Sequence, residues 1–199
     1  MRIPLLLCLA LLTAPAAFAE EAREPPSSAA PVVARKSPAE MRADRLDGLF
    51  AKLRLARDED EAKKAEESIW KLWMTSDSPT AEVLLGQASA AMAAKQFDAS
   101  LEILDSLVEV HPDFAEAWNK RATLYYLLGR TRDSLADIDT VLDLEPRHFG
   151  ALSGRGMIHQ KEKNFSAAMA AFRDALAVNP SMSSIKKAIK QIEKFEREI

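Results

Sequence analysis

The sequence predicts an all-α fold in which helical pairs of equal length stack side by side. Pro112, Pro146 and Pro180 are evenly spaced along the chain. Their period is about 34 residues, and a fixed period of roughly 20–50 residues is typical of stacked repeat units rather than of one globular core. Small and large apolar residues recur in the same register, and the segments on both sides of the repeated region carry apolar residues at helical spacing.

The recurring positions alternate between small side chains and large apolar ones. Small residues let the two helices of a pair approach closely, and large residues then fill the space between them. We therefore expect these positions to form the core, and we expect Trp118→Ala to cost about 3–5 kcal/mol through a cavity. Proline ends the second helix of each copy because it cannot continue a helix. The structural positions are Ala88, Leu104, Pro112, Trp118, Ala122, Tyr125, Ile138, Pro146, Gly156, Ala168, Phe172 and Pro180.

In this register the chain resembles the tetratricopeptide repeat (TPR) family. The family pattern has a period of about 34 residues, with an aromatic residue, a small residue, a tyrosine and a closing proline at fixed positions. Trp118, Ala122, Tyr125 and Pro146 fill these positions in the middle copy. The resemblance implies a short right-handed helical-repeat solenoid. Its three repeats would occupy residues 81–114, 115–148 and 149–182.

Two further elements are expected at the ends of the repeated region. Residues 38–80 have the spacing of a helical pair but lack the small residues of a repeat, so we interpret them as a degenerate pair that closes the front of the array. Ser37 and Glu40 predict a capping box at its start, with Pro38 at the first helical position. Residues 183–199 predict an amphipathic capping helix, whose basic face could also contact anionic lipid or a partner.

The segment at positions 1–19 has the pattern of a secretory signal peptide. Arg2 precedes an apolar run, and Ala17 and Ala19 form a small-residue cleavage site before Glu20. The run is too short to span the ~30 Å of hydrocarbon in a bilayer. Residues 20–37 are rich in Ala, Pro, Ser and Glu and predict a disordered tether. We therefore expect a mature chain without a transmembrane segment that acts in the bacterial periplasm.

The composition offers no catalytic or metal-binding constellation. The single cysteine, Cys8, lies in the predicted signal peptide, and no histidine has a second histidine three or four residues away. We expect His111 and His148 in surface turns and His159 packed in the tyrosine position of the third repeat. The net charge of −3 gives no electrostatic footprint for nucleic acid. Neither a cofactor nor an enzymatic activity is predicted.

Two arginines stand where the family pattern has leucine. Arg121 lies in a slot that should face Asp137 within one repeat, and we predict a partly buried ion pair between them. Arg155 has Ala171 in the corresponding slot, so its partner must come from another repeat or from a ligand. Pairing between repeats is the interpretation that we favour.

The resemblance implies a protein that binds a peptide or protein segment in the concave groove lined by the first helix of each repeat. The groove mixes apolar and neutral hydrogen-bonding side chains, which suit variable partners. It lacks the lysine, asparagine and arginine set with which chaperone-tail binders of the family grip a C-terminal carboxylate. The predicted groove residues are Leu85, Ser89, Met92, Asn119, Thr123, Tyr126, Ser153, Met157 and Gln160.

Two functions remain open from the sequence. The first is a scaffold or adaptor in the bacterial cell envelope, which follows from the groove and the predicted export. The alternative is a self-associating structural protein, because the degenerate pair could leave an apolar patch formed by Trp70, Leu72, Trp73 and Met74. The sequence identifies neither the partner nor the oligomeric state.

Overall fold

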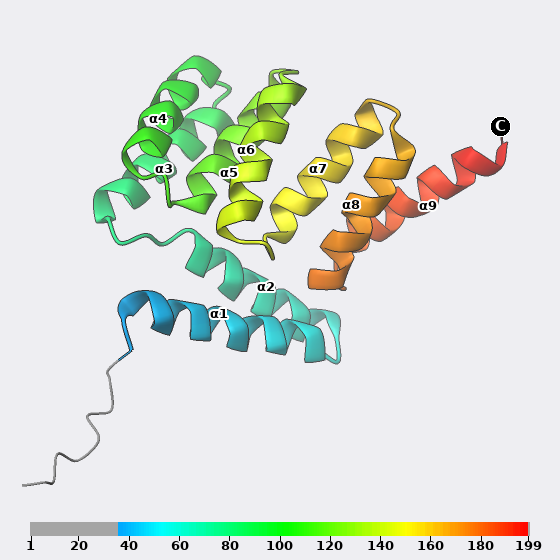
Figure 1. The fold of residues 1–199 in the computed structure, drawn as a ribbon, viewed down its shortest axis with the longest axis horizontal. Helices are drawn as coiled ribbons and strands as arrows, with labels where there is room; N and C mark the ends of the chain where they lie inside the picture. Colours follow the sequence, from blue (N-terminus) through cyan, green and yellow to red (C-terminus); the bar gives the residue numbers. More distant parts are fainter. Residues whose placement is uncertain (1–35, 199) are drawn as a thin grey trace, which may run out of the picture. The chain divides into compact units, whose positions relative to one another are not determined.

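The computed structural model describes residues 36–198, which fold into α-helices joined by short turns (Figure 1). This part of the chain contains no strand, which confirms the all-α prediction. The predicted signal peptide at 1–19 and the predicted tether up to residue 35 lie outside the described residues. The helices are α1 (Pro38–Leu55), α2 (Glu59–Trp73), α3 (Pro79–Ala93), α4 (Phe97–Val110), α5 (Ala115–Leu127), α6 (Thr131–Leu144), α7 (Phe149–Lys161), α8 (Phe165–Val178) and α9 (Ser183–Glu198).

Three helical pairs form a continuous stack: α3 with α4, α5 with α6, and α7 with α8 (Figure 1). The second helix of each pair contacts the first helix of the next. The first helices also meet, α3 with α5 and α5 with α7, whereas no comparable contact joins the second helices. The stack therefore curves with its first helices on the concave side, as a helical-repeat solenoid does.

Buried hydroxyl groups join the two helices within the first two pairs. Ser100 Oγ donates to the carbonyl of Ala88 at 2.9 Å, and Ser134 Oγ donates to the carbonyl of Ala122 at 2.7 Å. Both serines are buried, so each hydroxyl finds its partner inside the pair. A serine at this position thus keeps the helices as close as alanine would and adds one hydrogen bond.

The third pair places an aromatic ring against a glycine instead. A Cβ atom at Gly156 would lie 2.4 Å from ring atoms of Phe172. Gly156→Ala is therefore expected to lower the free energy of unfolding by about 1–3 kcal/mol, because a packed core has no space for the methyl group. Urea denaturation followed by circular dichroism measures the change.

The matched control for this prediction is Gly86→Ala. Gly86 lies inside α3, and no atom lies within 4 Å of the position that its Cβ would take. Alanine there should stabilise the chain by about 0.5–1 kcal/mol, because glycine is a poor residue for a helix interior. Similar effects of the two substitutions would contradict the close packing of Gly156 on Phe172.

The turn inside each pair has the same backbone geometry in all three copies. Lys95, Gly129 and Lys163 have positive φ angles of 59°, 75° and 60°. Each residue ends the first helix with the two backbone hydrogen bonds of a Schellman motif. Glycine adopts this left-handed conformation without strain and lysine does not. The repeat period therefore persists in the backbone where the sequence has lost it.

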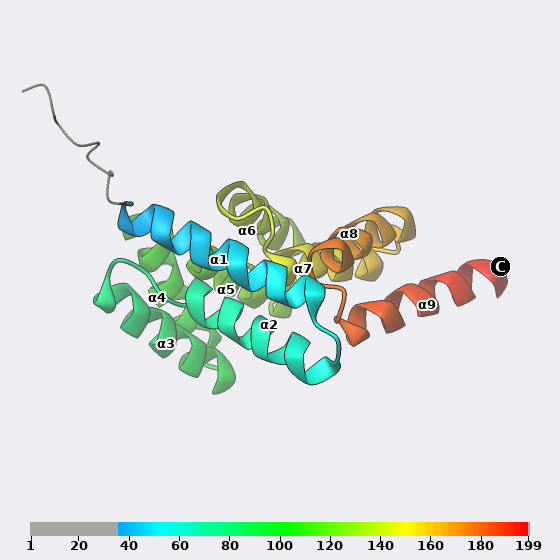
Figure 2. The ribbon, with the colours of Figure 1, turned by 90° about the horizontal axis from the view of Figure 1, so that it is seen from below.

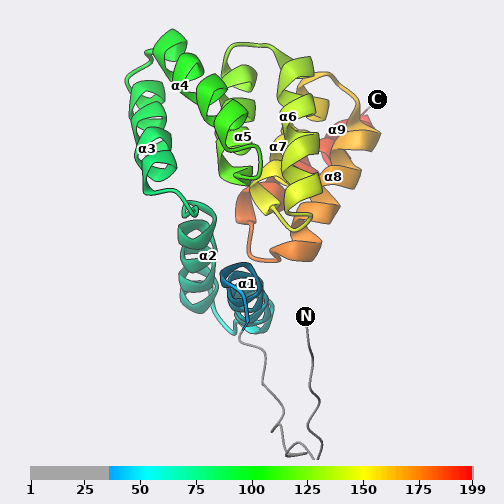
Figure 3. The same ribbon diagram turned by 60° about the vertical axis from the view of Figure 1, so that its left-hand side comes forward.

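The α1–α2 pair does not close the front of the stack, which corrects the prediction for residues 38–80. α2 makes no contact with α3 comparable to that between α4 and α5. The pair lies instead along the edge of the stack where α5 and α7 begin (Figures 2 and 3). Its first helix does begin with the predicted capping box of Ser37 and Glu40, in which both hydrogen bonds are formed.

The side chains explain this placement. The small positions of a repeat are occupied by Arg54 and Glu66, which prevent the close approach that stacking requires. The aromatic face of the pair packs instead on the start of α7, where Trp73 and Phe149 share one core cluster. Asn179, at the end of α8, donates to Glu66 Oε2 at 3.1 Å. The pair is thus anchored to the third repeat.

The last helix, α9, covers the other end of the stack. Ile185 and Ile192 are buried in one cluster with Phe172 of α8. The Phe195 ring lies 5.2 Å from the Phe165 ring and remains 46% exposed. The apolar face of α9 is therefore largely used within the fold, and its opposite face remains in solvent.

Candidate functional site

A pocket opens on the concave side between α5 and α7. Its volume is about 120 Å³, below the roughly 300–1,000 Å³ of pockets for whole small molecules. It therefore suits one side chain of a longer ligand. Side chains of Thr123, Tyr126 and Met157 line it together with the backbone of Gly150 and Gly154. Its other lining residues are Asn119, Ala122, Ser134, Ile138, Ala151 and Ile158.

Four predicted groove residues line this pocket, from two consecutive repeats: Asn119, Thr123, Tyr126 and Met157. Thr123 and Met157 are exposed, and Tyr126 is half-buried. Asn119 is only 8% exposed, and its Nδ2 donates to Glu116 Oε2 at 3.1 Å. The amide group of Asn119 is thus engaged within the protein. Asn119 therefore shapes the pocket as well as offering a donor to a ligand.

Leu85 is not a groove residue, which corrects the prediction. It is fully buried in the core cluster that contains Leu104 and Leu124. Ser153 is also buried, and its Oγ donates to the carbonyl of Gly150 at 2.9 Å. Both side chains are therefore withdrawn from the surface that the repeat position suggested.

The remaining predicted groove residues are half-buried. Ser89 Oγ donates to the carbonyl of Leu85 at 2.8 Å, and Met92 packs against the core of the first pair. Gln160 stands near the end of α7. These three residues stay predictions, since they lie outside the lining of the pocket.

A buried polar cluster lies beneath this edge of the groove. Glu116 and His148 are fully buried, with His148 Nε2 and Glu116 Oε2 3.1 Å apart. The backbone N–H of Ala151 donates to His148 Nδ1 at 3.1 Å, which places the imidazole proton on Nε2, where it donates to Glu116. Lys120 Nζ lies 3.3 Å from Glu116 Oε1. The cluster ties the start of α5 to the start of α7.

His148 is therefore no surface residue, and that prediction was wrong. Its ring stacks on Trp73 with centroids 4.0 Å apart and planes 14° from parallel. Phe114 occupies the equivalent position one repeat period earlier. It also directly precedes the first helix of a repeat, and it is also buried. This apolar equivalent was the signal in the sequence that could have identified His148 as a core residue.

The α2 helix borders the groove through Trp70. A Cβ atom at Gly150 would lie 2.7 Å from the Trp70 ring, so only glycine admits this approach. Trp70 and Trp73 meet edge to face with centroids 5.2 Å apart, and Trp73 is 3% exposed. Trp73 is thus packed within the chain, whereas Trp70, Leu72 and Met74 are half-buried. The predicted apolar patch for self-association therefore lacks its central tryptophan.

A second, wider hollow of about 760 Å³ separates the α1–α2 pair from the turns before α5 and α7. Arg42, Arg45, Asp77, Asp113 and Glu145 contribute charges of both signs to its lining. Arg42 Nη1 donates to Thr75 Oγ1 at 3.0 Å across part of it. This mixed lining favours no single class of ligand.

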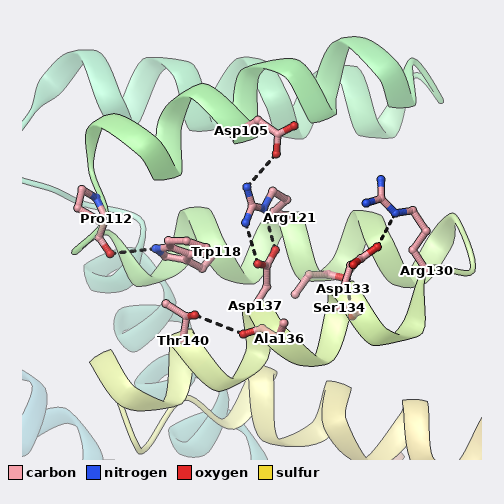
Figure 4. Close-up of polar contacts among 11 residues, drawn as sticks. Asp105, Pro112, Trp118, Arg121, Arg130, Asp133, Ser134, Ala136, Asp137 and Thr140 are labelled. Atoms are coloured by element: carbon pink, nitrogen blue, oxygen red, sulfur yellow. Dashed lines mark hydrogen bonds and ion pairs between the residues drawn. The ribbon is translucent and has the colours of Figure 1, made fainter.

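The predicted ion pair of Arg121 is confirmed, and the arginine has a second partner (Figure 4). Its Nε and Nη2 donate to the two carboxylate oxygens of Asp137 at 2.8 Å, and its Nη1 donates to Asp105 at 2.8 Å. The hydrogen bond with Asp137 raises the pKa of Arg121 above its normal value. Arg121 therefore stays charged and links α4, α5 and α6.

Arg155 pairs with Asp139 of the preceding repeat, which confirms the favoured interpretation. Asp139 stands one repeat period after Asp105, so both arginines reach back to the same repeat position. The Asp139 side chain is 69% exposed, whereas that of Asp137 is 6% exposed. The contact of Arg155 is thus a surface ion pair, and that of Arg121 is not.

This difference leads to a prediction for the two arginines. Arg121→Ala is expected to cost about 3 kcal/mol of unfolding free energy, because it leaves the Asp137 carboxylate buried without its partner. Arg155→Ala is expected to cost less than about 1 kcal/mol, because its partner is exposed. Urea denaturation of both variants measures the difference, and equal losses would contradict the assignment of Asp137 as a buried carboxylate.

Trp118 is half-buried rather than part of the closed core. Its Nε1 donates to the carbonyl of Pro112 at 2.9 Å, and the Arg121 guanidinium lies 4.8 Å above its ring (Figure 4). The expected cost of Trp118→Ala falls accordingly to about 2 kcal/mol or less, because less apolar surface is buried.

The described residues offer little to hold a metal ion. Residues 36–198 contain no group of three or more His, Cys, Asp or Glu side chains placed to bind one. His159 is half-buried, with Nδ1 3.9 Å from Glu162. Within the same residues no helix has the length and apolar character to cross a bilayer.

Comparison with known proteins relates this geometry to a family. The tetratricopeptide repeat pattern matches residues 85–133 and again residues 119–183. A TPR repeat-containing protein of Rhizobium etli is 35% identical over 161 residues, which cover 81% of this chain and 79% of that protein. Protein SGT1 homolog of Bos taurus is 31% identical over 108 residues, which cover 54% of this chain and 32% of that protein.

Solved structures share the architecture of the stack. The Sgt2 TPR domain from Aspergillus fumigatus superposes with a TM-score of 0.57 at 18% identity, covering 61% of this chain and 82% of that domain. The first TPR of Spaghetti (RPAP3), bound to an HSP90 peptide, superposes with a TM-score of 0.57 at 17% identity. The superposition covers 61% of this chain and 96% of that domain. At these identities the similarity shows the fold alone.

Proposed function

Because the chain belongs to the tetratricopeptide repeat family, we propose that it is a non-catalytic scaffold that binds a segment of another protein between α5 and α7. The observation that carries the proposal is the pocket on the concave side, lined by Thr123, Tyr126 and Met157. Members of this family bind protein and peptide partners, and the RPAP3 domain is described in complex with an HSP90 peptide. One side chain of such a segment would bind in the pocket.

The lining favours an uncharged segment with a small apolar side chain. Gly150 and Gly154 line the pocket without contributing a charged or polar side chain, while Met157 and Tyr126 supply apolar contacts. The positions with which chaperone-tail binders grip a carboxylate include Leu85 and Glu116, and both are buried. The lining of the pocket itself holds no cation for an acidic C-terminus like that of the HSP90 peptide SRMEEVD, and the nearby Lys161 Nζ lies over the Tyr126 ring, 5.0 Å from its centroid.

We further propose that the protein works in the bacterial cell envelope, on the periplasmic side. The proposal rests on the signal-peptide pattern of residues 1–19. N-terminal sequencing of the protein recovered from a periplasmic fraction is expected to begin at Glu20. Recovery of the protein only from the cytoplasm, with this N-terminal segment still attached, would overturn the periplasmic assignment and leave the groove unaffected.

A crosslinking pull-down tests the groove. The bait is the chain expressed from its full sequence with a C-terminal tag, beside Thr123→Arg and Met157→Arg variants. Both positions are exposed at the pocket, so arginine should fill the pocket without disturbing the core. Partners captured by the parent are expected to be lost from both variants. The same positions avoid Asn119, whose replacement would also disturb Glu116.

Ala170→Arg is the matched control for the pull-down. Ala170 is exposed on α8, outside the lining of the pocket, and arginine there adds the same charge and bulk. Circular dichroism establishes that all three variants remain folded. Partners that survive in the groove variants but disappear with Ala170→Arg would contradict the proposed site.

A further inference from the structure

One helix at the start of the stack carries a continuous row of acidic side chains. Asp98, Glu102, Asp105 and Glu109 of α4 are all exposed and are spaced by four, three and four residues, which aligns them on one face of the helix. α4 contains no basic residue. Among the ion pairs of residues 36–198, Asp105 alone of the four takes part in one, with Arg121.

The last helix of the stack, α9, carries an excess of basic residues, although it also holds Glu193, Glu196 and Glu198, and Glu193 lies beside Lys190 and Arg197 on the helix surface. On α9, Lys186, Lys190, Lys194 and Arg197 are exposed and spaced by four, four and three residues, with Lys187 beside them. Lys194 Nζ lies 3.7 Å from Glu198 at the edge of this row. The apolar residues of α9 pack against α8, so the cationic row points away from the stack.

The two rows match in length. Lys186 to Arg197 and Asp98 to Glu109 each span 11 residue steps, or about 16 Å along a helix at ~1.5 Å per residue. α4 and α9 stand at opposite ends of the stack (Figure 1). The rows therefore cannot pair within one chain, although each is complementary to the other.

We propose that the basic row of α9 binds the acidic row of α4 in a second copy of this chain. Each copy then offers one acidic and one basic end, so every contact joins unlike surfaces of two copies. Such an interaction is independent of the groove between α5 and α7. It also differs from association through the α1–α2 pair, in which Trp73 is buried inside the chain.

A second copy fits these observations better than a lipid surface. A helix that lies in a membrane interface buries its apolar face among the acyl chains, but Ile185 and Ile192 are already buried in the protein. Exposed ion pairs each contribute about 0–1 kcal/mol, and salt screens them within about 10 Å at 0.1 M. The association is therefore weak and strongly dependent on salt.

Sedimentation velocity of the purified protein over a range of concentrations tests the proposal. At about 20 mM salt the mean sedimentation coefficient should rise with concentration, and at about 500 mM salt it should stay at the monomer value. A charge-reversed α9 variant (Lys186→Glu, Lys190→Glu, Lys194→Glu) and a charge-reversed α4 variant (Asp98→Lys, Glu102→Lys, Glu109→Lys) should each remain monomeric at low salt.

Recombining the reversed rows makes the test specific. A mixture of the two variants should associate again at low salt, because each then meets the opposite charge, and one chain with all six substitutions should self-associate like the parent. A parent that stays monomeric at low salt overturns the proposal, whatever the variants do. So does a charge-reversed variant that associates like the parent. Binding of a monomeric parent to phosphatidylglycerol vesicles would assign the basic row to lipid instead.

Discussion

Replacing Trp73 with alanine is expected to lower the free energy of unfolding by about 3–5 kcal/mol, the cost of removing a large buried aromatic side chain. Trp73 is 3% exposed and contacts four rings, those of Phe50, Trp70, His148 and Phe149. Two of these rings belong to the α1–α2 pair, and two belong to the start of α7. The substitution therefore removes the side chain that attaches the pair to the stack.

Urea denaturation followed by circular dichroism measures the loss, and Trp73→Phe is its control. The Trp73 indole Nε1 is buried without a hydrogen-bond partner, so phenylalanine removes an unsatisfied donor while it keeps most of the packing. We expect Trp73→Phe to cost about 1–2 kcal/mol, less than Trp73→Ala, because the smaller ring leaves a smaller cavity. A Trp73→Ala variant as stable as the parent would contradict the placement of the α1–α2 pair.

Glu116→Ala should have an effect of comparable size, about 3–5 kcal/mol, because it removes one member of a buried, hydrogen-bonded charge cluster. Glu116 is fully buried and accepts from Asn119 and His148, while Lys120 lies at ion-pair distance. Alanine leaves the two donors without a partner in the interior. The loss should appear in urea denaturation as a lower midpoint with an unchanged slope.

Glu116→Gln separates the charge from the hydrogen bonds. Glutamine keeps one carbonyl oxygen that can accept from His148, and it loses the negative charge beside Lys120. We therefore expect an intermediate loss, smaller than that of Glu116→Ala. If both substitutions leave the midpoint unchanged, Glu116 is not the buried acceptor that its contacts indicate.

The repeated part of the fold could be predicted from the sequence because its period is set by local packing. Gly156 and Phe172 are an example: position 156 requires glycine because the Phe172 ring occupies the space that a side chain would take. The Arg121–Asp137 pair could be predicted for the same reason, since both positions belong to one repeat. Contacts within one unit of the period are encoded at fixed spacing.

The position of the α1–α2 pair could not be predicted, because it depends on contacts across roughly half the chain. Nothing in the spacing of Trp70 or Trp73 points to Phe149. The contacts of the α1–α2 pair also bury His148, which the sequence had placed on the surface. The prediction that Leu85 lines the groove was wrong for a related reason. Residues at the same repeat position are not equally exposed where the neighbouring elements differ.

Site-specific photo-crosslinking is the measurement that tests the central claim most directly. A photoreactive amino acid replaces Met157, which is 40% exposed at the pocket, in one strain and Ala170 on α8 in another. We predict that irradiation of living cells joins a partner to the protein through position 157 and not through position 170. A partner captured at position 170 but never at position 157 would contradict binding in the groove between α5 and α7.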